Sequence, residues 1–255
     1  DELALVDLII PDEFQPGPPL EVLATWRVLQ VPPEEVTLRW RLISGAGAVA
    51  YETETEIVPG RAAIPLPSGL LTTMQYRLPI GTAIPAGNYS LRIAIVSGDG
   101  QQIAEKFSTN VRLAARARVF SAPDMQQRVN ADYSGQVTLL GYDIAQDGGS
   151  IDLTLYWLAQ REIYKDYKYF VHVWSGGNVV AQADAMPRNN QYPTSWWAAG
   201  EVVSESVRLN LPGTGEYMLT AGFYDPVDGV RLPAVSVDGL ENLRQWVDLQ
   251  RVEMP

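Results

Sequence analysis

The stretch VTLRWRL at residues 36–42 alternates apolar and polar side chains without a break. Strict alternation predicts a β-strand with one buried face, because successive side chains of a strand point to opposite sides of the sheet. Arg39 and Arg41 must then face away from the core, since burying two unpaired guanidinium groups would cost several kcal/mol. The opposite face, which we expect to line a core, carries Val36, Leu38, Trp40 and Leu42.

Much of the chain occurs twice in the same order. Three blocks align at an offset of 131 residues and a fourth aligns after a small deletion: 21–29 with 152–160, 36–54 with 167–185, 76–80 with 207–211, and 86–100 with 214–229. Four blocks in one order indicate an internal repeat. We therefore expect two copies of one domain.

Each block has the features of β-structure. Alternating segments are separated by clusters of Gly, Asp, Pro and Asn, and no segment of ten or more residues carries a convincing helical stripe. Strands at such short spacing are typical of sandwiches and barrels. The sequence predicts an all-β protein of two tandem antiparallel β-sandwich domains, immunoglobulin- or fibronectin-III-like in architecture: copy one at 1–115, a linker at 116–129 and copy two at 130–255.

Two local features refine this prediction. Tyr89 and Tyr217 each lie at the start of a strand that follows a turn. This position is typical of the tyrosine corner, in which the tyrosine hydroxyl bonds to the backbone a few residues upstream. The alternative is a core tyrosine whose hydroxyl reaches solvent. The stretch GLENLRQW, near residues 240–247, is the best short helical candidate, and residues 247–254 predict a final strand.

Composition excludes several classes of function. The 255 residues carry a net charge of −11 and no cysteine. Binding to nucleic acid or to an anionic membrane needs a basic patch, so we expect neither partner. Thiol catalysis, disulfides and thiolate metal sites are excluded. No apolar run approaches the roughly 18 residues that a membrane-spanning helix needs.

The repeat also predicts which side chains of copy two face outward. Carried across from Arg39 and Arg41, the alternation places Phe170, His172 and Trp174 on the outer face. The neighbouring strand adds Met218, Thr220, Gly222 and Tyr224. Such a patch is usually covered. The other domain or the C-terminal strand is the first candidate for a cover, and a ligand or a partner protein is the alternative.

The stretch NNQYPTSWWAAGE at residues 189–201 contributes more aromatic rings. Tyr192 and Trp196 are candidates for stacking on a sugar. Adjacent side chains of an extended segment point in opposite directions, so we expect Trp197 to be buried and Trp196 to be the more exposed ring.

No catalytic or metal-binding motif stands out. His172 is the only histidine, no nucleophile-elbow motif accompanies it, and we expect it to hydrogen-bond across strands. Asp225 and Asp228 form a weak calcium candidate without an Asp-rich calcium loop around them. Most other carboxylates stand singly in turns. We predict no catalytic residue and no cofactor.

Copy two resembles a known module. LLGYDI (139–144), LTLYWLAQ (153–160), YKYFVHVW (167–174), VVAQADAMP (179–187), YPTSWWAAGE (192–201) and YMLTAGFYDPVDGVRLP (217–233) occur in one order. Together they resemble the C-terminal β-sandwich of bacterial family-39 (dolichyl-phosphate-mannose mannosyltransferase-like) membrane glycosyltransferase-type proteins, over residues 137–250. The resemblance implies an extracytoplasmic, non-catalytic module, because the catalytic acids of that family belong to its membrane part.

These observations predict an accessory module of the cell envelope that binds a glycan or a protein. The candidate residues are Tyr192, Trp196, Phe170, His172, Trp174 and Tyr224. Two alternatives stay open: a structural envelope or filament subunit that self-associates through edge strands, and a glycoside hydrolase whose two acids are not recognisable in the sequence.

Overall fold

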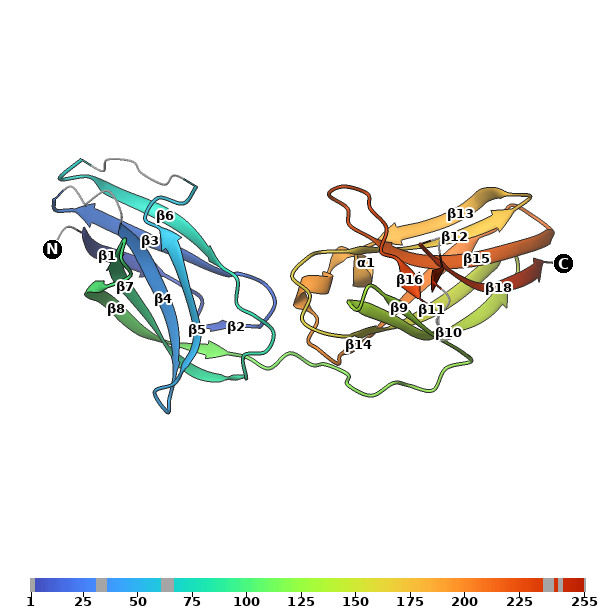
Figure 1. Ribbon diagram of the computed structural model, residues 1–255, viewed down its shortest axis with the longest axis horizontal. Coiled ribbons are helices and arrows are strands. Elements are labelled where there is room, and N and C mark those ends of the chain that lie inside the picture. The colour runs from blue at the N-terminus through green and yellow to red at the C-terminus, as the bar shows by residue number, and fades with distance from the viewer. Residues whose placement is uncertain (1–2, 31–35, 61–66, 236–240, 243–244, 255) are drawn as a thin grey trace. The chain divides into compact units, whose positions relative to one another are not determined.

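The computed structural model describes residues 3–30, 36–60, 67–235, 241–242 and 245–254. The chain divides into two units, Asp1–Arg116 and Ala117–Pro255, and each unit is built almost entirely from antiparallel strands (Figure 1). The boundary lies one residue beyond the end predicted for copy one. The predicted all-β sandwich fold is confirmed.

The first unit contains two sheets. One has the order β1-β3-β6, with the bounds Leu3–Ile9, Leu20–Val28 and Leu71–Leu78. The other has the order β2-β8-β7-β4-β5, with the bounds Glu13–Phe14, Gln102–Leu113, Gly87–Ser97, Val36–Ser44 and Val49–Glu56. All pairs are antiparallel except the short parallel pair β2–β8.

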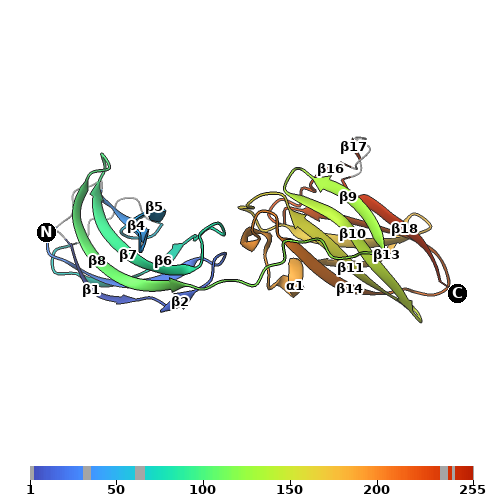
Figure 2. The ribbon, with the colours of Figure 1, turned by 90° about the horizontal axis from the view of Figure 1, so that it is seen from below.

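The second unit also contains two sheets. One has the order β14-β11-β10-β9-β16-β17, with the bounds Val202–Asn210, Ser150–Ala159, Val137–Asp147, Gln127–Tyr133, Ala234–Val235 and Glu241–Asn242. Figure 2 shows the short strands β16 and β17 near β9. The other sheet has the order β13-β12-β15-β18, with the bounds Asn178–Ala185, Lys168–Ser175, Gly215–Tyr224 and Val247–Met254. The predicted C-terminal strand is therefore confirmed.

The two units share a pairing order. The strands β1-β3-β6 correspond to β10-β11-β14, and β5-β4-β7-β8 corresponds to β13-β12-β15-β18. The register agrees as well: Trp26 of β3 lies opposite Thr72 of β6. In the second unit Trp157 of β11 lies opposite Val203 of β14, at the same two positions 131 residues later. Gene duplication as the origin of this likeness stays a prediction.

Each core is centred on tryptophan. In the first unit Trp26 and Trp40 are fully buried, and the Trp40 ring centroid lies 4.9 Å from that of Tyr76. In the second unit the ring of Trp157 meets Phe223 edge-on at 4.7 Å. Aromatic rings bury large apolar areas, so these clusters supply much of each core's stabilisation.

The inner and outer faces are as the alternation predicted. Leu38, Trp40 and Leu42 are fully buried, whereas Arg39 and Arg41 pair with glutamates of β5 on the outer side. In β12 the inward side chains are Tyr169, Val171 and Val173.

Both predicted tyrosine corners are confirmed. The Tyr89 hydroxyl donates to the carbonyl oxygen of Pro85 at 2.7 Å. The Tyr217 hydroxyl donates to the carbonyl oxygen of Gly213 at 2.9 Å. Each bond ties the start of a long strand to the turn before it.

Residues 240–247 do not form the expected helix where they are described. Glu241–Asn242 pair with β16 as strand β17, Val247 begins β18, and residues 240, 243 and 244 lie outside the described residues. The longest helical segment described, α1 (Pro187–Asn190), contains left-handed residues: Arg188 and Asn189 have φ of 52° and 54°. A 3₁₀ turn, η1 (Thr194–Trp196), follows it.

Candidate functional site

A row of rings lies on the outer face of the second unit. Phe170, His172 and Trp174 alternate along β12 with the inward residues. Their centroids are 4.7 Å apart from Phe170 to His172 and 6.0 Å apart from His172 to Trp174. Tyr224 of β15 extends the row, at 6.4 Å from Phe170. The structure thus brings together four of the six predicted site residues.

Arg231 and Trp246, from the segment that connects β15 to β18, pack against this row. The Arg231 guanidinium carbon lies 4.6 Å from the centroid of Phe170 and 5.3 Å from that of Trp246. Trp246 in turn stacks beside Trp174 at 6.2 Å, with 24° between the ring planes. The cover therefore comes from the second unit itself, from a connection rather than from the terminal strand.

Phe170 is consequently buried, with 2% of its surface exposed. The prediction that it offers an open ring to a ligand is wrong. Its ring occupies the space above Gly222, where an added Cβ would lie 2.3 Å from the Phe170 Cζ. Alternation predicts the face of a side chain, but it does not predict what packs on that face.

His172 is enclosed between Phe170 and Trp174. Its Nδ1 is buried and has no hydrogen-bond partner in the described part of the chain, so the expected cross-strand bond is not made through that atom. The opposite residue, Thr220, accepts a hydrogen bond from Trp174 Nε1 at 3.0 Å instead. Burial lowers the pKa of His172, and the Arg231 charge lowers it further against a smaller opposing effect of Asp184.

Tyr224 uses its hydroxyl within the unit. The hydroxyl donates to Asp184 Oδ1 at 2.7 Å. Burial and this carboxylate acceptor raise the pKa of Tyr224 to about 12. Tyr224 therefore stays neutral at physiological pH and holds the first end of the ring row against β13.

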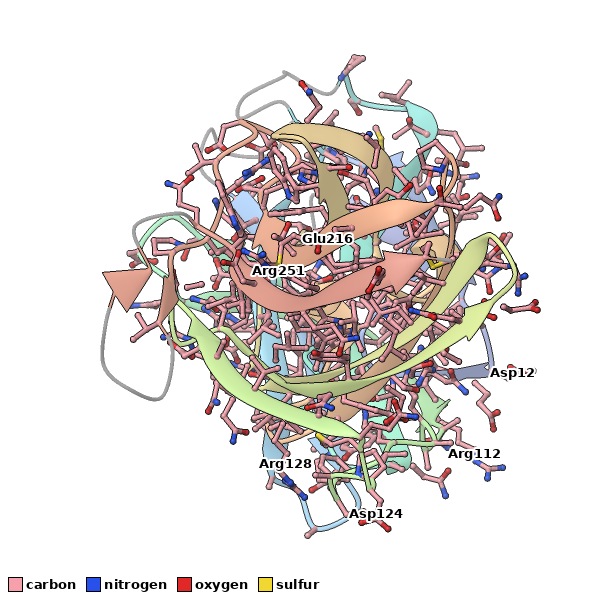
Figure 3. The ribbon with its side chains drawn as sticks, turned by 90° about the vertical axis from the view of Figure 1, so that its right-hand side faces the viewer. Asp12, Arg112, Asp124, Arg128, Glu216 and Arg251 are labelled. Carbon is pink, nitrogen blue, oxygen red and sulfur yellow. The ribbon has the colours of Figure 1, made fainter. Side chains whose placement is uncertain are left out.

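A groove remains open at the other end of the row. Its volume is about 650 Å³, and the side chains that define it are Trp174, Glu216, Met218, Trp246, Asp248 and Arg251. Glu216 of β15 and Arg251 of β18 are labelled in Figure 3. Neither side chain forms a hydrogen bond or an ion pair with another residue that the structure describes. The groove therefore combines two stacked indoles with a carboxylate and a guanidinium that are free to meet a ligand.

The stretch around residue 192 forms a separate, buried cluster. Tyr192 is 1% exposed and its ring stacks on Trp197 at 6.5 Å, so it belongs to the core and the prediction of a ligand-stacking ring is wrong. Trp197 is fully buried and Trp196 is half-buried, in the predicted order. The assumed extended backbone was wrong, however, because Thr194–Trp196 form the turn η1.

An ion pair between Arg118 and Glu201 fastens the predicted linker to the second unit. The two side chains are 7% and 1% exposed. Arg118 Nη1 also donates to the Tyr192 hydroxyl at 2.8 Å, and Glu201 accepts from the Ala198 amide at 3.0 Å. No sequence pattern predicted this pair, because Arg118 lies in a segment without regular secondary structure. Because both side chains are buried and paired with each other, we assign the pair a structural role.

The weak calcium candidate consists of turn residues that already have partners. Asp225 pairs with Lys165 Nζ at 2.7 Å and accepts from the Val227 amide. Hydrogen bonding to Lys165 holds the pKa of Asp225 below its usual range. Asp228 accepts from the Val230 amide at 2.8 Å. In the described ranges no three His, Cys, Asp or Glu residues gather as metal ligands would.

Within the described ranges, no helix has the length and apolar character needed to cross a membrane. No protein-family model matches the chain, and no curated protein is significantly similar to it. The fold and the groove define an all-β protein of two antiparallel units, with an aromatic hollow on the outer face of the second.

Proposed function

We propose that the second unit binds a glycan in the groove that Trp174 and Trp246 line, and that the chain adds no chemistry of its own. The observation that carries the proposal is the pair of nearly parallel indole rings at the wall of an open groove. Binding sites for small molecules commonly combine aromatic walls with a few polar groups that fix orientation.

The polar atoms of the groove suit a hydroxyl-rich ligand. Trp174 Nε1 already donates to Thr220, so this indole offers a ligand its ring rather than its N–H group. One side of a pyranose ring carries mainly C–H groups and can pack on such a ring. Glu216 accepts hydrogen bonds and Arg251 donates them, so together they match sugar hydroxyls.

We also propose that the chain acts outside the cytoplasm, as an accessory part of a cell-envelope protein. This proposal is supported by the resemblance of residues 137–250 to the β-sandwich of family-39 glycosyltransferase-type proteins. The net charge of −11 favours neither a nucleic acid nor an anionic membrane as the partner.

The glycan proposal is tested with Trp174→Ala and a matched control, Trp196→Ala. Trp196 is half-buried in the same unit but does not line the groove. Binding is screened on a polysaccharide array and measured by titration calorimetry, with circular dichroism to confirm folding. We expect Trp174→Ala to weaken binding at least about tenfold, equivalent to about 1.4 kcal/mol, and Trp196→Ala to bind as the wild type does.

Two results would overturn the proposal. One is that no glycan binds. The other is that Trp196→Ala, rather than Trp174→Ala, abolishes binding. A release of reducing sugar that Glu216→Gln removes would instead favour the hydrolase, because Glu216 and Asp248 line the same groove and a glycosidase needs two carboxyl groups.

A further inference from the structure

The first unit has a hollow at the same place in its fold. It lies on the outer face of the sheet that contains β4, β7 and β8, and its volume is about 510 Å³. We propose that this hollow is a second saccharide site, which binds through hydrogen bonds without a stacking ring. The inference rests on the proposed function of the second unit.

The positions correspond strand by strand. In the first unit the hollow is formed by the end of β4 with the turn after it, the start of β7, and β8. In the second unit it is formed by the end of β12 with the turn after it, the start of β15, and β18. Met218 lies opposite Arg251, as Ser90 lies opposite Asn110. The equivalent lining residues are Ile43 and Trp174, Asn88 and Glu216, and Asn110 and Arg251. The shared fold thus forms the hollow twice, and the side chains decide what each one binds.

The hollow of the first unit is lined by polar groups that can meet a ligand. Asn88 and Asn110 are exposed, and their carboxamides make no hydrogen bond within the described chain. A carboxamide both donates and accepts, as a sugar hydroxyl does. Arg112 pairs with Glu13 at 3.2 Å, but both side chains are more than half exposed. An exposed pair contributes little and can exchange for a ligand.

A neighbouring hollow extends this surface. Its volume is about 380 Å³, and Asn88 and Arg112 line both hollows. A ligand that spans the two hollows would therefore pass over these two side chains. This continuity favours an oligosaccharide over a single sugar as the occupant.

The two sites should differ in strength. Trp174 is replaced by Ile43 in the first unit, so no indole stacks on the sugar there. Each hydrogen bond to a solvated ligand adds only a small net gain, because it replaces hydrogen bonds to water. We therefore expect the first unit to bind at least about tenfold more weakly than the second.

The test is a calorimetric titration of the whole chain with cellohexaose, mannohexaose and chitohexaose. For the probe that binds, we expect two sites, a tighter one that Trp174→Ala removes and a weaker one that Asn88→Ala with Asn110→Ala removes. Gln75→Ala is the matched control, since this exposed residue of β6 lies on the other sheet of the first unit. The control should keep both sites.

Nuclear magnetic resonance supplies a second measurement for a weak site. The side-chain amide signals of Asn88 and Asn110 should shift with the probe even in the Trp174→Ala chain. A single site that Trp174→Ala removes, with both amide signals unmoved, would overturn the second site and leave the proposed function intact. A lack of binding by every probe would overturn the proposed function itself.

Discussion

Two equivalent strands, β4 of the first unit and β12 of the second, carry different kinds of side chain on their outer faces. In β4 the outward positions carry Arg39 and Arg41, which pair with Glu54 and Glu52 of β5. In β12 the equivalent positions carry aromatic and histidine rings that are buried or half-buried. The two units agree in strand pairing order and register, so the backbone does not decide which outer face is exposed to solvent.

The connection to the last strand explains the difference. In the first unit β7 turns directly into β8 across residues 98–101. In the second unit residues 225–246 intervene between β15 and β18 and contribute Arg231 and Trp246 to the outer face. In the second unit, therefore, the aromatic outer face is accompanied by residues of this segment that pack on it.

The largest expected effect on stability comes from breaking the buried ion pair of the second unit, and breaking exposed ion pairs is the comparison. Arg118→Ala leaves Glu201 buried without its counter-charge and should lower the free energy of unfolding of the second unit by about 3–5 kcal/mol. Urea unfolding combined with hydrogen exchange of each unit's strands measures it. The control Arg208→Ala removes only exposed pairs and should cause no measurable change. Equal effects of the two variants would contradict the contrast.

The next expected effect compares one position across the units. Phe170→Ala removes a buried ring and should destabilise the second unit by about 3 kcal/mol. Arg39→Ala removes a pair at the solvent boundary and should destabilise the first unit by about 1 kcal/mol. The same unfolding measurements apply. Similar losses would mean that the two outer faces are energetically alike.

The smallest expected effect is a pH dependence confined to one unit. The pKa of His172 is lowered by burial in the folded state and is about 6.5 in the unfolded chain. At pH values between the folded-state pKa and about 6.5, the unfolded state binds more protons than the folded state does. The contribution of His172 to stability is therefore fully present above about pH 6.5, and it is lost as the pH falls toward the folded-state pKa.

The first unit has no histidine, so its urea midpoint should stay constant between about pH 7.5 and pH 5.5. The midpoint of the second unit should fall over this range. His172→Gln should remove that fall. A fall that persists in His172→Gln would show that another group is responsible.

The sequence predicted most of the fold because the fold depends on local alternation. Two arginines in VTLRWRL assigned the faces of β4, and the repeat carried this assignment to β12. The tyrosine corners at Tyr89 and Tyr217 were predicted by their position after a turn. Such patterns are readable because backbone geometry forces period two on every strand.

The candidate site was only partly predictable, because the residues that cover or line it come from segments that show no alternation of apolar and polar residues. Trp246 belongs to the stretch GLENLRQW, which suggested a helix, and nothing local shows that it stacks beside Trp174. The burial of Phe170 depends on Arg231, and that of Tyr192 on Arg118 and Glu201, which are long-range contacts.

The long connection before β18 also constrains the order of folding. Closing its 22 residues costs about 1.5 kcal/mol more chain entropy than closing the four residues between β7 and β8. Synthesis proceeds from the N-terminus, so the rings of β12 leave the ribosome before Arg231 and Trp246 exist to cover them. The second unit therefore passes through an interval in which this surface is bare and open to aggregation, which the arginine-faced first unit avoids.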